Sequence, residues 1–170
     1  GDPSGIGPEI VSKLLCEKII DNANILVIGE RKILEEGENI SGKKGNFKFV
    51  NNSKDIVFDD ETKFFLDISK GTNRTYKYGQ VSAESGASVL EAMDKAMDLA
   101  NNKKIDAVNF GPMNKSSLIM GGCPYNDEHD YFQKKLRMKN FCCEFNVIDN
   151  FWTARVTSHI PIKEVSENIT

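Results

Sequence analysis

The sequence predicts an α/β fold in which buried parallel strands alternate with helices, and three observations support it. A loop rich in glycine and proline, residues 1–9, leads directly into a helical pattern. Two short apolar runs, residues 24–29 and 63–68, have the composition of buried parallel strands. The longest helical pattern begins at Ser82 and leads to a further apolar run, residues 105–110, so that strand, helix and strand would form a crossover unit.

The opening loop holds three glycines and two prolines in nine residues, too many for a strand or a helix. A helix is predicted from Pro8, which suits the first helical position because proline lacks the N–H that would be unpaired there. Apolar residues then recur with helical spacing: Ile10, Val11, Leu14, Leu15 and Ile19. Backbone N–H groups and the positive helix end would meet here, which favours binding of an anion or a substrate carboxylate. An ordinary capped helix start after a βα turn is the alternative.

A turn of this kind normally follows a buried strand, so we expect a strand before Gly1. Residues 164–170 follow a helical pattern without a cap. We therefore interpret the sequence as roughly the N-terminal half of a longer protein.

Between the predicted strands lie a short helix, residues 31–36, closed by Gly37, and a loosely alternating stretch, residues 46–60. A polar connecting loop, residues 70–80, leads to the long helix. Ser82 is the predicted cap of that helix, and its apolar stripe is expected in the core: Val89, Met93, Ala96, Met97 and Ala100.

Gly111 and Pro112 end the strand predicted after the long helix, and residues 113–115 lie in the turn. That turn would lie at the carboxyl edge of the sheet, where open α/β folds bind ligands. Lys115 is therefore a candidate functional residue, with an ordinary surface lysine as the alternative. The next break, residues 121–124, is a candidate boundary between two lobes.

After the break a helix is predicted, capped by one of two residues, Asn126 or Asp127. Two strands follow, residues 142–148 and 152–157, joined by a hairpin turn at residues 149–150. Residues 158–162 would end the second strand and start another helix.

The composition excludes several classes of function. A net charge of −3, with basic residues that never gather into a stripe, argues against a nucleic-acid-binding protein. No apolar run approaches the length that spans a membrane. The cysteines lack zinc-site spacing, which fits reduced thiols in a cytoplasmic protein: Cys16, Cys123, Cys142 and Cys143.

Two histidines, His129 and His159, are the candidates for metal or acid–base chemistry. His159 follows a predicted strand and would project at a sheet edge, but one histidine does not make a metal site, and a hydrogen-bonded loop histidine is the alternative. His129 lies among acidic residues, which equally suit the first turn of a helix. The sequence has no nucleophile-elbow serine, P-loop or dinucleotide-binding glycine motif after a strand. The residues alone therefore indicate an α/β ligand-binding protein, and an enzyme is the preferred interpretation.

With these positions established, the sequence resembles the 4-hydroxythreonine-4-phosphate dehydrogenase family of vitamin B6 synthesis. Four segments match the motifs of that family in order: residues 1–9, 81–86, 111–115 and 157–162. Ser158 stands where a threonine is common in the family. The first segment is also similar to the Gly-Asp-Gly-Ile-Gly-Pro-Glu motif of isopropylmalate and isocitrate dehydrogenases, which share the fold. The resemblance therefore implies a two-lobed α/β/α fold of the isocitrate/isopropylmalate dehydrogenase type.

By this resemblance, residues 1–121 form the first α/β lobe, with its N-terminal strand missing from the sequence, and residues 122–170 begin the second lobe. The second lobe would carry a metal-binding histidine and contacts of a homodimer whose active site lies at the interface.

The resemblance implies oxidation by NAD (or NADP) of a hydroxyl on 4-phosphohydroxy-L-threonine, followed by decarboxylation, in the synthesis of pyridoxal phosphate. A divalent metal (Zn, Mg or Co) would act as a Lewis acid in both steps. His159 matches the first of three metal-binding histidines, and the other two would lie beyond Thr170. By the same resemblance Lys115 is catalytic and His129 contacts the substrate, while no cofactor-binding residue is assigned.

One segment departs from the family. Residues 128–131 read Glu-His-Asp-Tyr where the family has Gly-His-Thr-Glu, so that only His129 is retained. Asp130 would place a negative charge where the threonine of the family touches the substrate, and that charge would repel a phosphorylated, carboxylated acid. Two alternatives stay open: a paralogue acting on another hydroxy acid, such as D-threonate or D-erythronate 4-phosphate or a cyclic diol acid, and a catalytically silent relative that binds a small anion.

Overall fold

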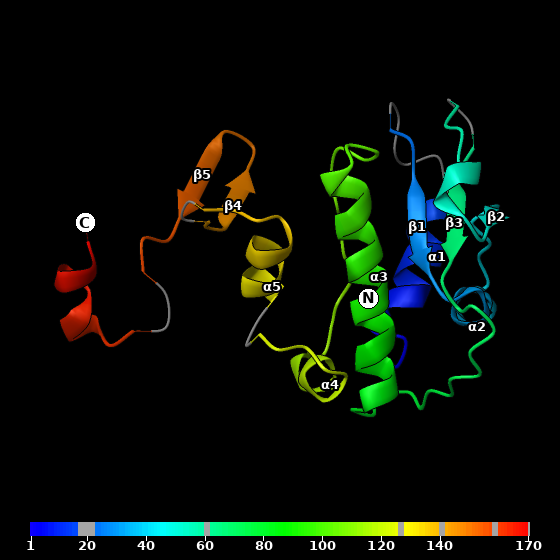
Figure 1. Cartoon of the computed structure of the whole chain (residues 1–170), viewed down its shortest axis with the longest axis horizontal. Coiled ribbons are helices and arrows are strands. Elements are labelled where there is room, and N and C mark those ends of the chain that lie inside the picture. Colours follow the sequence, from blue (N-terminus) through cyan, green and yellow to red (C-terminus); the bar gives the residue numbers. More distant parts are fainter. Residues whose placement is uncertain (17–22, 60–61, 126–127, 140–141, 158–159, 170) are drawn as a thin grey trace.

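A three-stranded parallel sheet lies among the first elements of the chain (Figure 1). The computed structural model describes residues 1–16, 23–59, 62–125, 128–139, 142–157 and 160–169. Across the sheet the strands are, in order, β1 (Leu26–Gly29), β3 (Phe64–Asp67) and β2 (Lys48–Val50). Val27 and Phe49 lie opposite Phe65 from its two sides. The apolar residues of β3 are at most 2% exposed (Phe64, Phe65 and Leu66). The predicted α/β class with buried parallel strands is confirmed.

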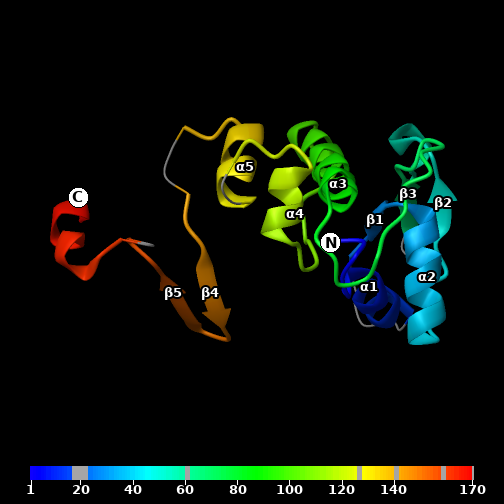
Figure 2. The same ribbon diagram turned by 90° about the horizontal axis from the view of Figure 1, so that it is seen from below.

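Two helices, α1 (Gly7–Cys16) and α2 (Arg31–Ser41), pack against each other beside the sheet (Figure 2). Gly37 lies in the middle of α2, and a Cβ atom there would lie 2.6 Å from Pro8. The prediction that Gly37 ends this helix is therefore wrong, because the glycine serves the close approach of α1. The helix ends instead at Gly42, whose φ of 67° is in the left-handed region that glycine favours.

The long helix α3 (Ala83–Asn101) begins as predicted, with the Ser82 hydroxyl accepting a hydrogen bond from the Ser85 N–H at 3.1 Å. Most of the predicted apolar stripe of α3 is buried, and it forms one core with two shorter helices, α4 (Lys115–Met120) and α5 (Glu128–Lys135). Gly86 makes this packing possible, because a Cβ atom there would lie 1.7 Å from the Ser117 carbonyl oxygen. The packing of α3, α4 and α5 fixes the position of Lys115.

The segment 105–110 is not a strand, contrary to the prediction. A parallel strand exists only through a hydrogen-bonded ladder, and none of the hydrogen bonds of the described backbone forms a ladder with this segment. Val108 nevertheless packs against the core of α3. The Pro112 carbonyl accepts a hydrogen bond from the Asp2 N–H at 2.9 Å, so the end of the segment contacts the opening loop.

The predicted hairpin is confirmed, with β4 (Phe145–Ile148) antiparallel to β5 (Phe151–Ala154) and Asp149 in the turn at a φ of 47°. All residues of both strands are exposed, and the hairpin lies beyond α5 from the sheet (Figure 1). The helix predicted after β5 is wrong in type: two short 3-10 turns form instead, Ile162–Glu164 and Ser166–Asn168. Nothing in the structure tests the predicted division into residues 1–121 and 122–170. Among the described residues, no helix combines the length and apolar character needed to cross a membrane.

Candidate functional site

The opening loop forms one wall of a cleft of about 310 Å³. Its residues lie directly before α1, and the other walls are residues 79–80 and 112–114. The cleft therefore joins the first sequence motif to the motif that ends in Lys115. These are two of the four segments on which the resemblance rests.

Asp2 holds the loop in this position. The side chain is 6% exposed, and its Oδ1 accepts hydrogen bonds from the Ser4 N–H at 2.7 Å and from the Ser85 hydroxyl of α3. The Ser4 carbonyl in turn accepts from the Gly79 N–H at 2.8 Å. Within the described structure the Ser4 hydroxyl is buried without a hydrogen-bond partner. The loop is thus fixed by polar contacts from three parts of the chain, with one hydroxyl left over.

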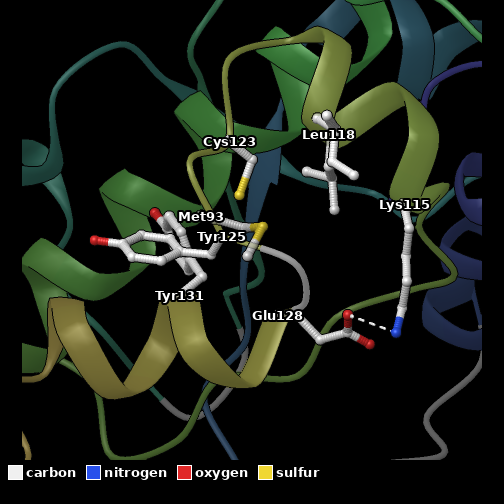
Figure 3. Close-up of a pocket in the computed structure, with 8 residues that line it drawn as sticks. Met93, Lys115, Leu118, Cys123, Tyr125, Glu128 and Tyr131 are labelled. Carbon is white, nitrogen blue, oxygen red and sulfur yellow. Dashed lines mark ion pairs between the residues drawn. The ribbon is translucent and has the colours of Figure 1, made fainter.

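Lys115 is the first residue of α4, and its neighbour Asn114 caps that helix by accepting a hydrogen bond from the Ser117 N–H at 2.9 Å. Asn114 also lines the cleft. The Lys115 side chain is 61% exposed, and its Nζ lies 3.5 Å from Oε2 of Glu128, the first residue of α5 (Figure 3). The sequence singled out Lys115 but missed this partner, because the pairing depends on how α4 and α5 pack.

His129 and Asp130 lie in the first turn of α5, next to Glu128 in the chain. The His129 Nδ1 lies 3.3 Å from a carboxylate oxygen of Glu144, which also pairs with Arg155. Asp130 is exposed. His159, the predicted metal ligand, lies outside the described residues.

The part of the chain that the structure describes contains no group of three or more His, Cys, Asp or Glu side chains that could hold a metal ion. The described side chains therefore do not form a metal site by themselves.

A second cluster, which the sequence did not indicate, surrounds Glu30 at the end of β1. One oxygen of this buried carboxylate accepts from the Arg74 guanidinium at 2.9 Å and from the Tyr76 and Ser88 hydroxyls at 2.5 and 2.7 Å. Burial alone would lower the pKa of Arg74, but hydrogen bonds to Glu30 and Glu91 outweigh it and raise that pKa. Burial, and then the hydrogen bond to Glu30, raise the pKa of Tyr76. Arg74, Tyr76 and Ser88 each donate to Glu30, so the cluster is a structural tie between the end of β1, α3 and the loop before α3.

The fold and the cleft define an α/β protein with a cleft lined by the opening loop and by the residues just before α4. Residues 21–170 match the family described as "Pyridoxal phosphate biosynthetic protein PdxA", and the chain belongs to this family. The resemblance found in the motifs is confirmed.

Relatives within this family carry two kinds of name. A protein of Pasteurella multocida, 36% identical over 173 residues, bears the provisional name 4-hydroxythreonine-4-phosphate dehydrogenase; the match covers 100% of this chain and 51% of that protein. A protein of Fusobacterium nucleatum, 29% identical with the same coverage, bears the provisional name D-threonate 4-phosphate dehydrogenase. The chain thus spans about half the length of the curated relatives it matches.

Solved structures agree on the fold. A 4-hydroxythreonine-4-phosphate dehydrogenase from Burkholderia phymatum superposes with a TM-score of 0.82 at 28% identity, covering 98% of this chain and 50% of that one. A Salmonella typhimurium structure with a TM-score of 0.83 is 22% identical and supports the fold alone. The α/β fold of this dehydrogenase family is therefore confirmed.

Proposed function

We propose that the protein is an NAD-dependent or NADP-dependent dehydrogenase that oxidises and then decarboxylates a small phosphorylated hydroxy acid, with 4-phosphohydroxy-L-threonine as the first candidate. The supporting observation is that the opening loop and residues 112–114, from two motifs of the family, line one cleft directly beside Lys115. The dehydrogenase names of the relatives agree with this reaction class.

The cleft suits a small ligand. Its volume of about 310 Å³ is near the lower end of the range of roughly 300–1,000 Å³ for ligand pockets, so it fits a substrate or one part of a dinucleotide. The cofactor accepts a hydride when bound. The exposed ammonium of Lys115 carries a positive charge that can stabilise negative charge developing on a substrate oxygen. His129 and Asp130, on the first turn of α5, would contact the substrate.

A metal would act as a Lewis acid and His159 would be one of its ligands, together with groups from elsewhere in the protein. We further propose a cytoplasmic homodimer with the active site at its interface. The metal, its ligand His159 and the homodimer rest on the resemblance, and the cytoplasmic location rests on the cysteine pattern of the sequence.

The second candidate is a dehydrogenase for D-threonate 4-phosphate or D-erythronate 4-phosphate. Asp130 marks a departure from the family pattern in the segment that would contact the substrate, because a carboxylate in place of a threonine hydroxyl removes a donor and changes the local charge. An acid other than 4-phosphohydroxy-L-threonine is therefore a candidate. The D-threonate name of the Fusobacterium nucleatum relative agrees with it.

The test is a steady-state assay of NADH or NADPH formation by the full-length protein with the three phosphorylated acids in parallel. We expect turnover of at least one acid, lost on chelation and restored by Zn²⁺, Mg²⁺ or Co²⁺. Turnover that persists after chelation would contradict the proposal that the reaction requires a divalent metal. Binding of the acids without turnover of any would contradict the dehydrogenase and leave a silent anion-binding relative.

A further inference from the structure

The carboxylate of Glu128 lies in an unusual place for a charged group. Its Oε2 is buried and forms no hydrogen bond with any described residue. Figure 3 shows it at the edge of a small cavity whose other lining side chains are mainly apolar or aromatic: Met93, Leu118, Cys123, Tyr125 and Tyr131. The side chain as a whole is 26% exposed, but a buried carboxylate oxygen without a hydrogen bond is costly unless a nearby positive charge compensates it.

Lys115 supplies the compensating charge. Its Nζ is 3.5 Å from Glu128 Oε2, an ion pair rather than a hydrogen bond. The cavity behind the pair measures about 10 Å³, room for about one water molecule. No substrate fits behind the pair, so a ligand of Lys115 has to approach from the solvent side, where the lysine is exposed.

The helices that carry Lys115 and Glu128 are each held in place by a side-chain hydrogen bond. The start of α4 is capped by Asn114, and α5 is held to α3 by the Tyr131 hydroxyl, which donates to Asp94 Oδ1 at 2.6 Å. Fixed helices do not by themselves restrict the rotamers of a long lysine side chain. The position of its ammonium becomes defined only when a neighbouring group binds it. Glu128 is the carboxylate at that place.

We propose that Glu128 is a positioning residue: its carboxylate holds the Lys115 ammonium at the solvent edge of the small cavity, next in the chain to Asn114 of the ligand cleft, so that the ammonium can meet the substrate. The inference rests on the proposed function, in which Lys115 touches the substrate. In this proposal Glu128 acts through Lys115, since its buried Oε2 is the oxygen that faces the ammonium.

The experiment is a double-mutant cycle in the full-length protein, with kcat and KM measured for the acid that is turned over. Glu128→Gln keeps the shape and removes the charge, and it should lower kcat by about 10- to 100-fold, the scale of a misplaced catalytic group, with KM changed much less. Glu128→Asp should restore part of the loss. Because Glu128 acts through Lys115, Glu128→Gln should have no further effect on kcat in a Lys115→Met background.

The matched control is Glu35→Gln, which breaks an exposed ion pair with Arg31 on α2 and should leave kcat unchanged. Unchanged kcat in Glu128→Gln, or an equal loss with and without Lys115, would overturn the inference. A loss of kcat that follows a loss of folded protein in thermal unfolding would overturn it too.

A measurement without turnover separates this inference from the proposed function. The rate of amine modification of Lys115, followed by mass spectrometry, should rise in Glu128→Gln because the ammonium is no longer paired with a carboxylate. An unchanged rate would contradict the proposal that Glu128 positions the Lys115 ammonium. A wild-type protein that turns over no acid would overturn the proposed function, and the labelling would still decide whether Glu128 holds Lys115.

Discussion

Replacing Glu30 with alanine removes the acceptor of three donors at once. The carboxylate is 8% exposed and accepts hydrogen bonds from Arg74, Tyr76 and Ser88 through a single oxygen. In the variant the two hydroxyls lose this acceptor. The guanidinium keeps one partner, Glu91, at 3.0 Å. The replacement therefore leaves three polar groups, one buried and two partly buried, with fewer partners.

The expected loss follows from these contacts. Breaking a buried ion pair by removing one partner costs about 3–5 kcal/mol. Losing the acceptor of the two hydroxyls costs about 1 kcal/mol each. The interaction of Arg74 with Glu91 and with solvent recovers a similar amount of free energy, so these two terms offset each other. We therefore expect the free energy of unfolding to fall by about 3–5 kcal/mol. The midpoint of thermal unfolding should fall in parallel.

The assay is urea and thermal unfolding of the full-length protein. Glu35→Gln is again the control, because loss of an exposed i,i+4 pair should cost at most about 0.5 kcal/mol. A Glu30→Ala protein within about 1 kcal/mol of the wild type, below any buried-pair loss, would refute the reasoning and show that the cluster does not carry stability.

Three further predictions concern the cleft, the alkaline range and substrate choice. Gly5→Val should weaken binding of substrate or cofactor, measured by calorimetry, with little loss of stability, because a Cβ at Gly5 meets its nearest neighbour at 3.5 Å; Gly86→Ala, with a contact of 1.7 Å, should destabilise instead. Burial, and then the hydrogen bond to Asp94, raise the pKa of Tyr131. The contribution of the neutral hydroxyl to the free energy of unfolding is therefore complete below pH ~10 and is lost at higher pH by about 1.4 kcal/mol per pH unit. In pH-dependent unfolding Tyr131→Phe should flatten this fall, and an unchanged slope would contradict the raised pKa of Tyr131. Asp130→Thr should raise kcat/KM for 4-phosphohydroxy-L-threonine by between roughly five-fold and a thousand-fold; an unchanged or reduced value would show that Asp130 does not face the anionic groups.

Local patterns predicted the elements whose causes are local. The cap at Ser82 and the apolar stripe of α3 are properties of one stretch of chain, and both are present. A glycine after a short helical pattern predicts a helix end at Gly37, but the role of Gly37 depends on its close approach to Pro8, which is distant in sequence. Residues 105–110 have the composition of a strand, but a strand also needs a neighbour in register, which composition does not contain.

The candidate site divides in the same way. The motifs predicted that the opening loop and Lys115 belong to functional segments, and the structure brings the loop and the residues before Lys115 to one cleft. No pattern predicts that Glu128 pairs with Lys115, since two residues thirteen positions apart meet only through the packing of α4 and α5 on α3. The role of His159 stays a prediction.

We expect one part of this structure, the first turn of α5, to determine substrate specificity. The side chains of the opening loop and of Asn114 mainly hold the backbone: Asp2 accepts from the loop and from α3, and Asn114 caps α4. Changes there should alter binding of every ligand alike. The first turn of α5 is different, because it carries His129 and Asp130 and differs from the family pattern at three of four positions. Since the surrounding helices fix this turn, replacing its side chains can change which acid is accepted without moving the cleft. Variants of α5, rather than of the loop, should therefore separate the two candidate substrates.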